Sequence, residues 1–180
     1  MKKIEFFFYL TIITSLSLYN VIILIERMTL VRIYYDNTDI LKGEYFEIDG
    51  KKEGEYKLYY ANGKLRKMCT YNDGKLHGKY KLYHANGELE VDYTYNNGTR
   101  NGEFKTYHAN GEKYAIYTYD NGKINGEYKI YHANGNLATK CTYENGEING
   151  KHKEYHENGK LWMKCIYDNG KRNGVCKTYY

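Results

Sequence analysis

Apolar and polar residues alternate along most of the chain, in short runs separated by Asn-Gly and Asp-Gly pairs. Ahead of Asn62-Gly63, for example, Tyr56, Leu58 and Tyr60 occupy every second position. Strand side chains point alternately to the two faces of a sheet, so this period of two predicts β-strands with one apolar face. Asn-Gly and Asp-Gly favour a two-residue type I′ turn, because they tolerate the positive φ that both turn positions need. The chain is therefore expected to reverse direction every 11 or 13 residues.

The same pattern recurs every 24 residues without a gap. Each unit follows roughly the form G-x-Y-K-x-Y-H-A-N-G-x-L-x-x-x-(Y/C)-T-Y-x-N-G-x-x-N. The opening glycines are Gly54, Gly78, Gly102, Gly126, Gly150 and Gly174. The first turn pair of each unit begins at Asn62, Asn86, Asn110, Asn134 and Asn158, and the second at Asp73, Asn97, Asn121, Asn145 and Asn169. A fixed period of this length indicates a repeat protein whose units stack on their neighbours.

Turn positions also predict the register of each hairpin. Around Asn62-Gly63, the expected pairs are Tyr56 with Cys69, Leu58 with Lys67 and Tyr60 with Leu65. Around Asp73-Gly74, Tyr71 is expected to face Leu76 and Cys69 to face Gly78. Later units repeat this last pairing as Tyr93 with Gly102, Tyr117 with Gly126, Cys141 with Gly150 and Cys165 with Gly174. An opening glycine opposite Tyr or Cys is interpreted as room for a ring across the strand pair.

The sequence thus predicts an all-β fold, an elongated single-layer antiparallel β-meander of 24-residue hairpin repeats, with an N-terminal hydrophobic helix. The 24 Tyr and the absence of Pro support the strand-rich prediction. We divide the chain into a hydrophobic anchor or signal segment (1–27), a degenerate leading repeat or cap (28–53) and five repeats with a partial sixth (54–180). In the leading unit, Asp49-Gly50 and nearby tyrosines echo the repeat out of register.

The N-terminal segment is a separate feature. Phe6 to Ile25 form twenty residues without a charge, flanked by Glu5 and Glu26. As a helix, this run would span about 30 Å, the thickness of the hydrocarbon core of a membrane. It predicts membrane contact through residues 6–25, as an anchor, an uncleaved signal anchor or a cleaved signal peptide. The alternative is a hydrophobic extension ahead of a start at Met28, so we expect a membrane-anchored or exported protein, with the cytoplasm as the alternative location.

Two columns of residues on the other face of the strands form the candidate interaction surface. They are Lys57, Lys81, Lys105, Lys129 and Lys153, and two positions further on Tyr59, Tyr83, Tyr107, Tyr131 and Tyr155. A row of cations flanked by rings suits an acidic protein or anionic lipid headgroups, but exposed lysines also serve as a solvated face that limits aggregation. The net charge is only +5, and acidic residues such as Glu55 and Glu103 alternate with the lysines, so nucleic acid is not an expected partner.

Cysteines and histidines follow the repeat as well. Cys69, Cys141 and Cys165 share one phase, about 10 Å apart from unit to unit, which is too far for a disulfide and indicates small core residues. Cys176 is expected to face Met163, diagonal to Cys165, which makes these two the one pair of cysteines to check for a bond, although a diagonal spacing is usually too long. The histidines are His84, His108, His132 and His156. Their spacing cannot converge on one Zn²⁺, so we expect a packing role beside the turn and no metal site.

Catalysis is not expected, because each acid, base or nucleophile recurs in many equivalent surroundings, whereas an active site needs one distinct place. No catalytic residues, cofactor or small-molecule substrate are predicted, and motifs such as a Walker loop or H-E-x-x-H are absent from the sequence.

The phrases YHANGELE and YNDGKLHGKYKLYHANG resemble the MORN-repeat variant, a family that includes YwqK-type antitoxin-like proteins. The resemblance covers about Gly50 to Tyr180. It implies stacked antiparallel hairpins that serve as a scaffold for protein or lipid contacts, without catalytic residues. Three functions follow as hypotheses: a membrane-proximal scaffold for an unknown protein partner, a soluble antitoxin-like or adaptor protein, and a binder of anionic lipid surfaces.

Overall fold

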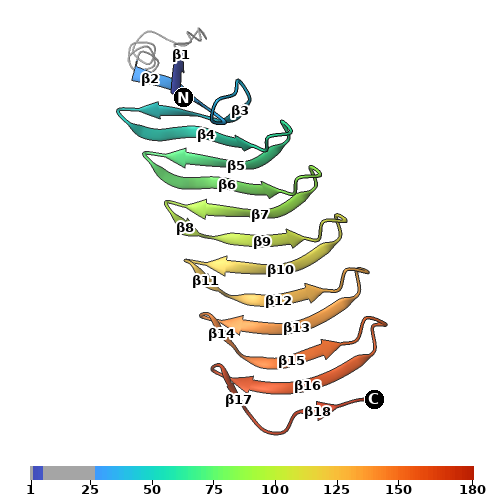
Figure 1. Ribbon diagram of the computed structural model, residues 1–180. Coiled ribbons are helices and arrows are strands. Elements are labelled where there is room, and N and C mark those ends of the chain that lie inside the picture. The colour runs from blue at the N-terminus through green and yellow to red at the C-terminus, as the bar shows by residue number, and fades with distance from the viewer. Residues whose placement is uncertain (1, 6–26) are drawn as a thin grey trace, which may run out of the picture.

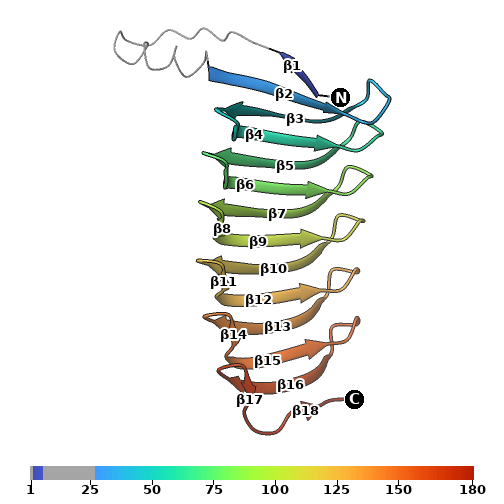
Figure 2. The ribbon, with the colours of Figure 1, turned by 60° about the vertical axis from the view of Figure 1, so that its left-hand side comes forward.

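The computed structural model describes residues 2–5 and 27–180. These residues form one antiparallel sheet of 18 strand segments, arranged as an open, twisted ribbon with the two chain ends at opposite ends (Figure 1). Seen from a second direction, the described residues make a single layer (Figure 2). The predicted all-β, single-layer antiparallel meander is confirmed.

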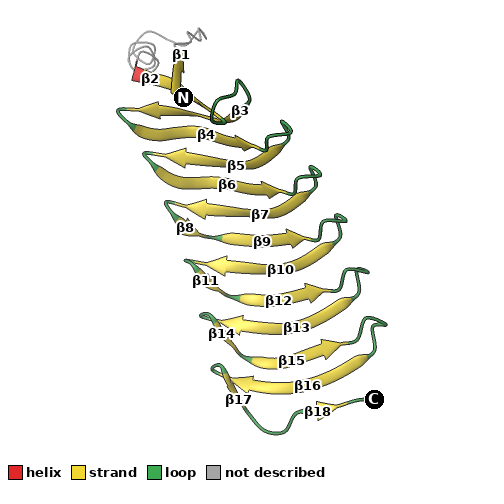
Figure 3. Ribbon diagram, in the orientation of Figure 1, coloured by secondary structure: helices red, strands yellow, loops and turns green. Residues whose placement is uncertain are grey.

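Short loops connect nearly all consecutive segments (Figure 3). The segments are β1 (Lys2–Glu5), β2 (Met28–Tyr34), β3 (Leu41–Ile48), β4 (Lys51–Tyr59), β5 (Leu65–Asn72), β6 (Lys75–Tyr83), β7 (Leu89–Asn96), β8 (Thr99–Arg100), β9 (Gly102–Tyr107), β10 (Lys113–Asp120), β11 (Lys123–Ile124), β12 (Gly126–Tyr131), β13 (Leu137–Glu144), β14 (Glu147–Ile148), β15 (Gly150–Tyr155), β16 (Leu161–Asp168), β17 (Lys171–Arg172) and β18 (Lys177–Thr178). The short segments β8, β11, β14 and β17 pair with the same strand as the segment that follows them. Each such pair is therefore one strand with an interruption.

The second turn of each unit has the predicted type I′ geometry. Asp73 and Gly74 both have positive φ, of 48° and 76°. The same holds for the pairs that begin at Asn97, Asn121, Asn145 and Asn169. In each unit the turn glycine also donates its N–H to a carbonyl of the preceding unit, as Gly98 does to Leu76 at 2.7 Å. These turns therefore close a hairpin and join two repeats.

The first turn of each unit is not a two-residue type I′ turn, so that expectation was wrong. Asn62 has no positive φ; instead Gly63 alone is left-handed, with φ of 79°. The Gly63 N–H donates to the Tyr60 carbonyl at 2.9 Å, and Tyr60 N–H donates to Lys64 at 2.8 Å. This is the pattern of a three-residue hairpin loop, in which a turn is followed by a left-handed glycine. As a result, Leu65 pairs with Tyr59 rather than with Tyr60.

The opening glycine of each unit forms a bulge, which corrects the predicted register of the second hairpin. Tyr71 faces Leu76 as expected, but Cys69 then faces Tyr80 and not Gly78. Gly78 has φ of 84°, in the left-handed region that side chains rarely adopt. The interpretation of these glycines as room for a ring is also wrong: a Cβ on Gly150 would meet no atom within 4 Å, and a Cβ on Gly102 would meet the Thr94 hydroxyl rather than a ring. The left-handed backbone conformation is the requirement that all of these positions share.

This bulge shifts the register by two residues, which leaves every side chain on its predicted face. Across the second turn it brings the ring of Tyr93 to Phe104 and that of Tyr117 to Tyr128, whereas Tyr80 faces Tyr93 and Phe104 faces Tyr117 across the first turn without any displacement. Tyr93 stacks with Tyr80 at 4.7 Å and with Phe104 at 5.0 Å between ring centroids. Phe104 continues to Tyr117 at 4.6 Å, and Tyr117 to Tyr128 at 4.9 Å. We call this row, with the residues beside it on the same side of the sheet, the aromatic face.

Few side chains are fully buried in so thin a structure. Among the described residues, the buried apolar side chains are Leu30, Val31, Cys69, Tyr93, Ala115, Cys141 and Cys165. The later units thus contribute about one central residue each, flanked by half-buried rings. Stability must then be spread along the array through contacts between neighbouring units, as in other repeat proteins.

The cysteines are partly as predicted. Cys69 and Cys141 are free and buried, consistent with small core residues. Cys165 and Cys176, however, form a disulfide, with Cα atoms 4.4 Å apart. The prediction failed because the bulge in the last unit aligns Met163 with Thr178, which moves Cys176 from the diagonal position to a place beside Cys165. The bond ties the chain before β18 to β16.

At the other end, β2 and β3 continue the sheet as a hairpin, and β1 pairs with β2. Asp49-Gly50 is also a left-handed pair, 24 residues before Asp73-Gly74, so this turn is in register with the repeats. The loop from Tyr35 to Ile40 is one residue longer than its counterpart from Tyr60 to Lys64, which explains the apparent loss of register. The predicted hydrophobic helix and membrane contact at 6–25 lie outside the described residues. Within the described ranges, no helix is long and apolar enough to cross a membrane.

Replacing Gly150 tests the role of the bulge. Gly150→Ala is expected to lower the free energy of unfolding by about 1–2 kcal/mol, because alanine is strained at positive φ. Gly150→Asn is the matched control, since asparagine is larger but tolerates this conformation better. It should therefore destabilise less than alanine in urea unfolding. If asparagine were the more harmful of the two, crowding rather than φ would be the constraint.

Alkaline pH tests the aromatic face. Burial is the main cause that raises the pKa of Tyr71 to about 12, and it also raises the pKa of Tyr56 and Tyr128. Because tyrosines of the unfolded chain ionise near pH 10, these tyrosines stabilise the fold below about pH 10 and lose that contribution at higher pH, which for Tyr71 happens as the pH rises towards about 12. The urea midpoint should fall over this window, as tyrosinate absorbance appears. Tyr71→Phe should show a smaller fall; an identical fall would contradict the assignment.

Candidate interaction surface

The predicted lysine and tyrosine columns lie on one face of the sheet, opposite to the aromatic face. We call it the lysine face. Lys57, Lys81, Lys105, Lys129 and Lys153 lie on β4, β6, β9, β12 and β15, each followed two positions later by the tyrosine of its strand. Residues two apart on a regular strand share a face, so each lysine and its tyrosine are neighbours. The structure therefore brings both columns together along the ribbon.

Carboxylates neutralise the first four lysines of the column. Lys57 pairs with Glu55 at 2.7 Å and Lys105 with Glu103 at 2.6 Å, each two positions earlier on the same strand. Lys129 pairs in the same way with Glu127, whereas Lys81 reaches across to Asp92 on β7 at 3.3 Å. The hydrogen bond that Lys57 donates to Glu55 is the main cause that raises the pKa of Lys57. These pairs are partly exposed and stabilise the fold little, so they mainly set the local charge of the surface.

The tyrosine column is half-buried and connected to its surroundings. The Tyr59 hydroxyl donates a hydrogen bond to Glu44 at 3.0 Å. Burial first, and then this hydrogen bond to a carboxylate, raises the pKa of Tyr59 to about 12. Tyr59 therefore remains neutral over the physiological range and offers a fixed ring edge beside Lys57.

The histidines beside the loops join neighbouring repeats. Nε2 of His84 donates to the Tyr107 carbonyl at 3.3 Å, and Nε2 of His132 donates to that of Tyr155 at 2.9 Å. In the first unit, the hydroxyl of Tyr60 takes the same role towards Tyr83 at 2.7 Å. The predicted packing role beside the turn is confirmed. In the described residues, no group of three or more His, Cys, Asp or Glu side chains is placed to hold a metal ion.

The recurring loop asparagines have a second role that the sequence did not reveal. Asn86 accepts from the Glu88 N–H at 3.0 Å within its own loop, and its amide donates to the Ala109 carbonyl of the next loop at 2.9 Å. Asn62 and Asn110 make the same bond to the following loop, at 3.3 and 3.1 Å. One edge of the ribbon is therefore held by side chains that run from loop to loop.

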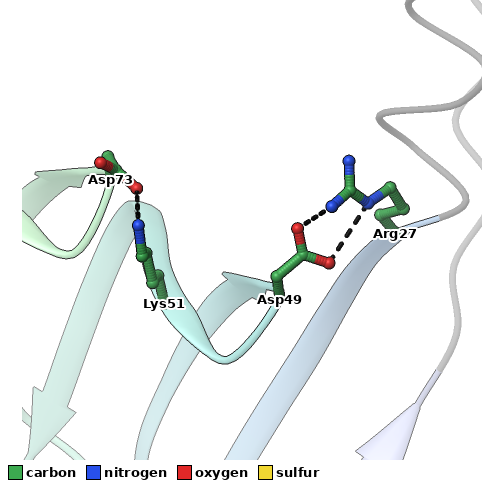
Figure 4. A network of polar contacts seen from close by, with 4 residues as sticks. All are labelled: Arg27, Asp49, Lys51 and Asp73. Atoms are coloured by element: carbon green, nitrogen blue, oxygen red, sulfur yellow. Dashed lines mark hydrogen bonds and ion pairs between the residues drawn. The ribbon is translucent and has the colours of Figure 1, made fainter.

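Ion pairs lie along the opposite edge, where the two-residue turns are. At the N-terminal end of the described ribbon, Lys51 bonds Asp73 at 2.6 Å, and Arg27 contacts Asp49 through two nitrogens (Figure 4). The hydrogen bond from Lys51 is the main cause that lowers the pKa of Asp73. Both aspartates are turn residues. The Lys51 contact therefore joins two successive turns, the Arg27 contact joins the residue before β2 to the turn at Asp49, and neither involves the lysine face.

Cations also lie on the aromatic face, and the sequence prediction missed them. Lys52 is 4.6 Å from the ring centroid of Tyr56, and Lys67 is 4.8 Å from that of Tyr80. Arg100 is 5.4 Å from the rings of both Tyr93 and Tyr119. Such contacts stabilise exposed pairs by about 0.5–1 kcal/mol each. These cations are therefore engaged by rings of their own sheet, in contrast to the columns of the lysine face.

The fold and its surfaces define the chain as a β-hairpin repeat protein with two chemically distinct faces. The family model of the MORN repeat variant matches five consecutive stretches, residues 52–73, 76–97, 100–121, 124–145 and 148–169. These cover more than half of the chain, which therefore belongs to the MORN repeat variant family. MORN repeats are known as protein-binding modules, and the family is in general non-enzymatic. A comparison with curated proteins finds no match.

The loop asparagines supply a test of the bonds between repeats. Asn86→Ala removes a bond within its loop and one to the next loop, whereas Asn158 makes the first (2.9 Å) and, among the described residues, has no following loop. Asn86→Ala should therefore lower the free energy of unfolding by about 0.5–1.5 kcal/mol more than Asn158→Ala in urea titrations. Equal effects would mean that the bond to the next repeat contributes nothing.

Proposed function

We propose that the protein is a non-catalytic repeat scaffold that presents its lysine face to a protein partner. The observation that supports this most is the placement of two chemically matched columns, lysine and tyrosine, on one face of an elongated single-layer sheet. Tyrosine is enriched in protein interfaces, and repeat arrays commonly bind along an extended surface. Membership of a family of protein-binding repeats supports the same proposal.

The geometry favours a protein over a small substrate. The hollow at the N-terminal end of the lysine face, lined by Leu30, Glu44 and Lys57 among others, holds about 130 Å³. Two larger hollows, of about 300 and 520 Å³, lie away from this face, at the turns of Asp49 and Asp73 and at the last loop of the ribbon, respectively. Sites for small molecules usually hold about 300–1,000 Å³. The lysine face instead offers a long, shallow surface, in which the same contacts recur on β4, β6, β9, β12 and β15.

The proposal includes a location near a membrane, supported by the length of the uncharged run at 6–25. An antitoxin-like or adaptor role is the alternative in which the same face binds a soluble partner.

Site-specific photo-cross-linking in the native cell tests this proposal. A photoreactive phenylalanine is placed at Tyr83, Tyr107 or Tyr131 of the full chain, on the lysine face. Control positions at Asn121 and Asn145 lie in exposed turns outside that face. We expect an adduct of the same mass from all three tyrosine positions and at least about tenfold less from the turns, since contact within reach is required. Adducts that form equally at the turns, or at no position, would contradict the scaffold.

The same adduct also locates the complex. If it sediments with membranes, the membrane-proximal form is supported; if it stays in the soluble fraction, the alternative of a soluble adaptor replaces it.

A further inference from the structure

The C-terminal part of the lysine face differs from the rest in its charge. The fifth column lysine, Lys153, has Lys151 at the position where Glu55, Glu103 and Glu127 stand in other units. Lys79 also replaces this glutamate in the second unit, but there Asp92 faces Lys81 and neutralises it. No such carboxylate faces Lys153, because its cross-strand neighbours are Lys140 and Lys164. The pattern that neutralises the first four units is thus absent from the last one.

Strand register turns these lysines into a continuous row. Lys140 on β13 faces Lys153 on β15, which faces Lys164 on β16, and Lys164 faces Lys177 on β18. Earlier units have Met68, Asp92 and Ile116 at the positions of Lys140 and Lys164. With neighbouring strands about 4.8 Å apart, four facing lysines span about 14 Å. We call these four residues, together with Lys151, the lysine row.

Like charges that face each other across a strand pair destabilise a sheet. Of the five members, Lys140 pairs with Glu127, which it shares with Lys129. The other four form no ion pair with any residue that the structure describes. Lys153 and Lys164 are also half-buried, so water screens their repulsion less than at a fully exposed site. The fold therefore concentrates unneutralised positive charge at one place, where an anionic partner would relieve it.

Apolar side chains adjoin the row. Trp162 and Ile166 flank Lys164 on β16, on the same face, and are 43% and 47% exposed. The counterparts of Trp162 are Arg66, Glu90, Tyr114 and Ala138, and those of Ile166 are all threonines, so only the last unit has both an exposed ring and an aliphatic side chain here. Tryptophan is enriched at the energetically dominant positions of protein interfaces. The combination of an exposed ring, an aliphatic side chain and a short cationic row suits a polypeptide better than a free anion.

The short length of the lysine row also favours a polypeptide as its ligand. Towards the N-terminus, Glu127, Glu103 and Glu55 follow at successive units of the face. A long nucleic acid or a flat anionic membrane would extend over these carboxylates and meet repulsion. An extended polypeptide needs only about four or five residues to cover 14 Å. A short acidic segment therefore matches the size of the positive surface.

We infer that the lysine row, with Trp162 beside it, is the docking site for a short acidic segment of a partner protein. This inference rests on the proposed scaffold function and names the chemistry of the segment that the scaffold binds. Glutamate or aspartate side chains of that segment would pair with Lys153, Lys164 and Lys177, and an apolar residue next to them would contact Trp162.

Fluorescence anisotropy with a labelled peptide of about eight glutamates tests the inference on the full chain. Lys153→Gln combined with Lys164→Gln should weaken binding by at least about tenfold, the effect of losing about 1.4 kcal/mol. Lys57→Gln combined with Lys81→Gln is the matched control, with the same change of charge on the same face, and should change the dissociation constant by less than about twofold. Equal losses in both variants, or no binding of the peptide to the wild-type protein, would overturn the inference.

A stability measurement separates loss of binding from loss of structure. Because the row is repulsive in the free protein, the urea midpoint of the Lys153→Gln, Lys164→Gln variant should rise or stay constant. A fall would refute the claim that these charges are unneutralised. Two further probes test the identity of the ligand: an eight-nucleotide oligothymidine and phosphatidylserine vesicles. Tighter binding of either one than of the peptide, through the same lysines, would also overturn the assignment.

The outcomes distinguish this inference from the proposed function. Cross-linking of a partner at Tyr83 and Tyr107 without binding of the glutamate peptide would keep the scaffold and reject the acidic segment. Peptide binding at the row without any cross-linked partner would reject the scaffold face instead.

Discussion

A left-handed glycine at the start of each unit determines how the repeats meet. The bulge that it forms moves the partner strand by two residues, so that Tyr80 rather than Gly78 lies opposite Cys69. The contact of Tyr93 with Phe104, the proximity of Cys165 to Cys176 and the pairing of Lys164 with Lys177 all depend on this same displacement. A conformation that only glycine adopts readily thus controls packing on one face and electrostatics on the other.

The sequence could predict the two faces of the sheet because side chains alternate between the faces along each strand. A displacement of two residues leaves each side chain on its face, so the two faces were predicted correctly. The pairs Tyr56 with Cys69 and Leu58 with Lys67 were also predicted correctly, and the pairs beyond the bulge were not. The two Asn-Gly signals look alike in sequence, yet only the second has two left-handed residues. In the first, Asn62 uses its side chain to bond Lys64 and Ala85, a choice that depends on the neighbouring repeat. Local turn propensity alone does not contain that information.

The candidate surface was predictable to a similar depth. Periodicity alone placed Lys57 and its equivalents in a column, and the glutamates two positions earlier were visible in the sequence. The replacement of this glutamate by Lys151 was visible too, but its effect on the local charge depends on the strand pairing. Across the sheet, Asp92 neutralises Lys81, whereas Lys153 faces another lysine, Lys164. The charge balance of a sheet depends on cross-strand neighbours as well as on neighbours along the chain, and the sequence alone shows only the latter.

The two long edges of the ribbon are held together by different means. On the loop edge, side chains such as Asn86 and His84 each bridge to the next repeat. On the turn edge, a backbone bond such as that of Gly98 to Leu76 joins successive units. At the N-terminal end, bonds such as that of Lys51 to Asp73 reinforce the turn edge as well. In the later repeats, spreading the loops apart therefore breaks more bonds than spreading the turns. The ribbon should bend more readily in the direction that opens its turn edge, which gives this thin sheet a preferred direction of curvature when it adapts to a partner.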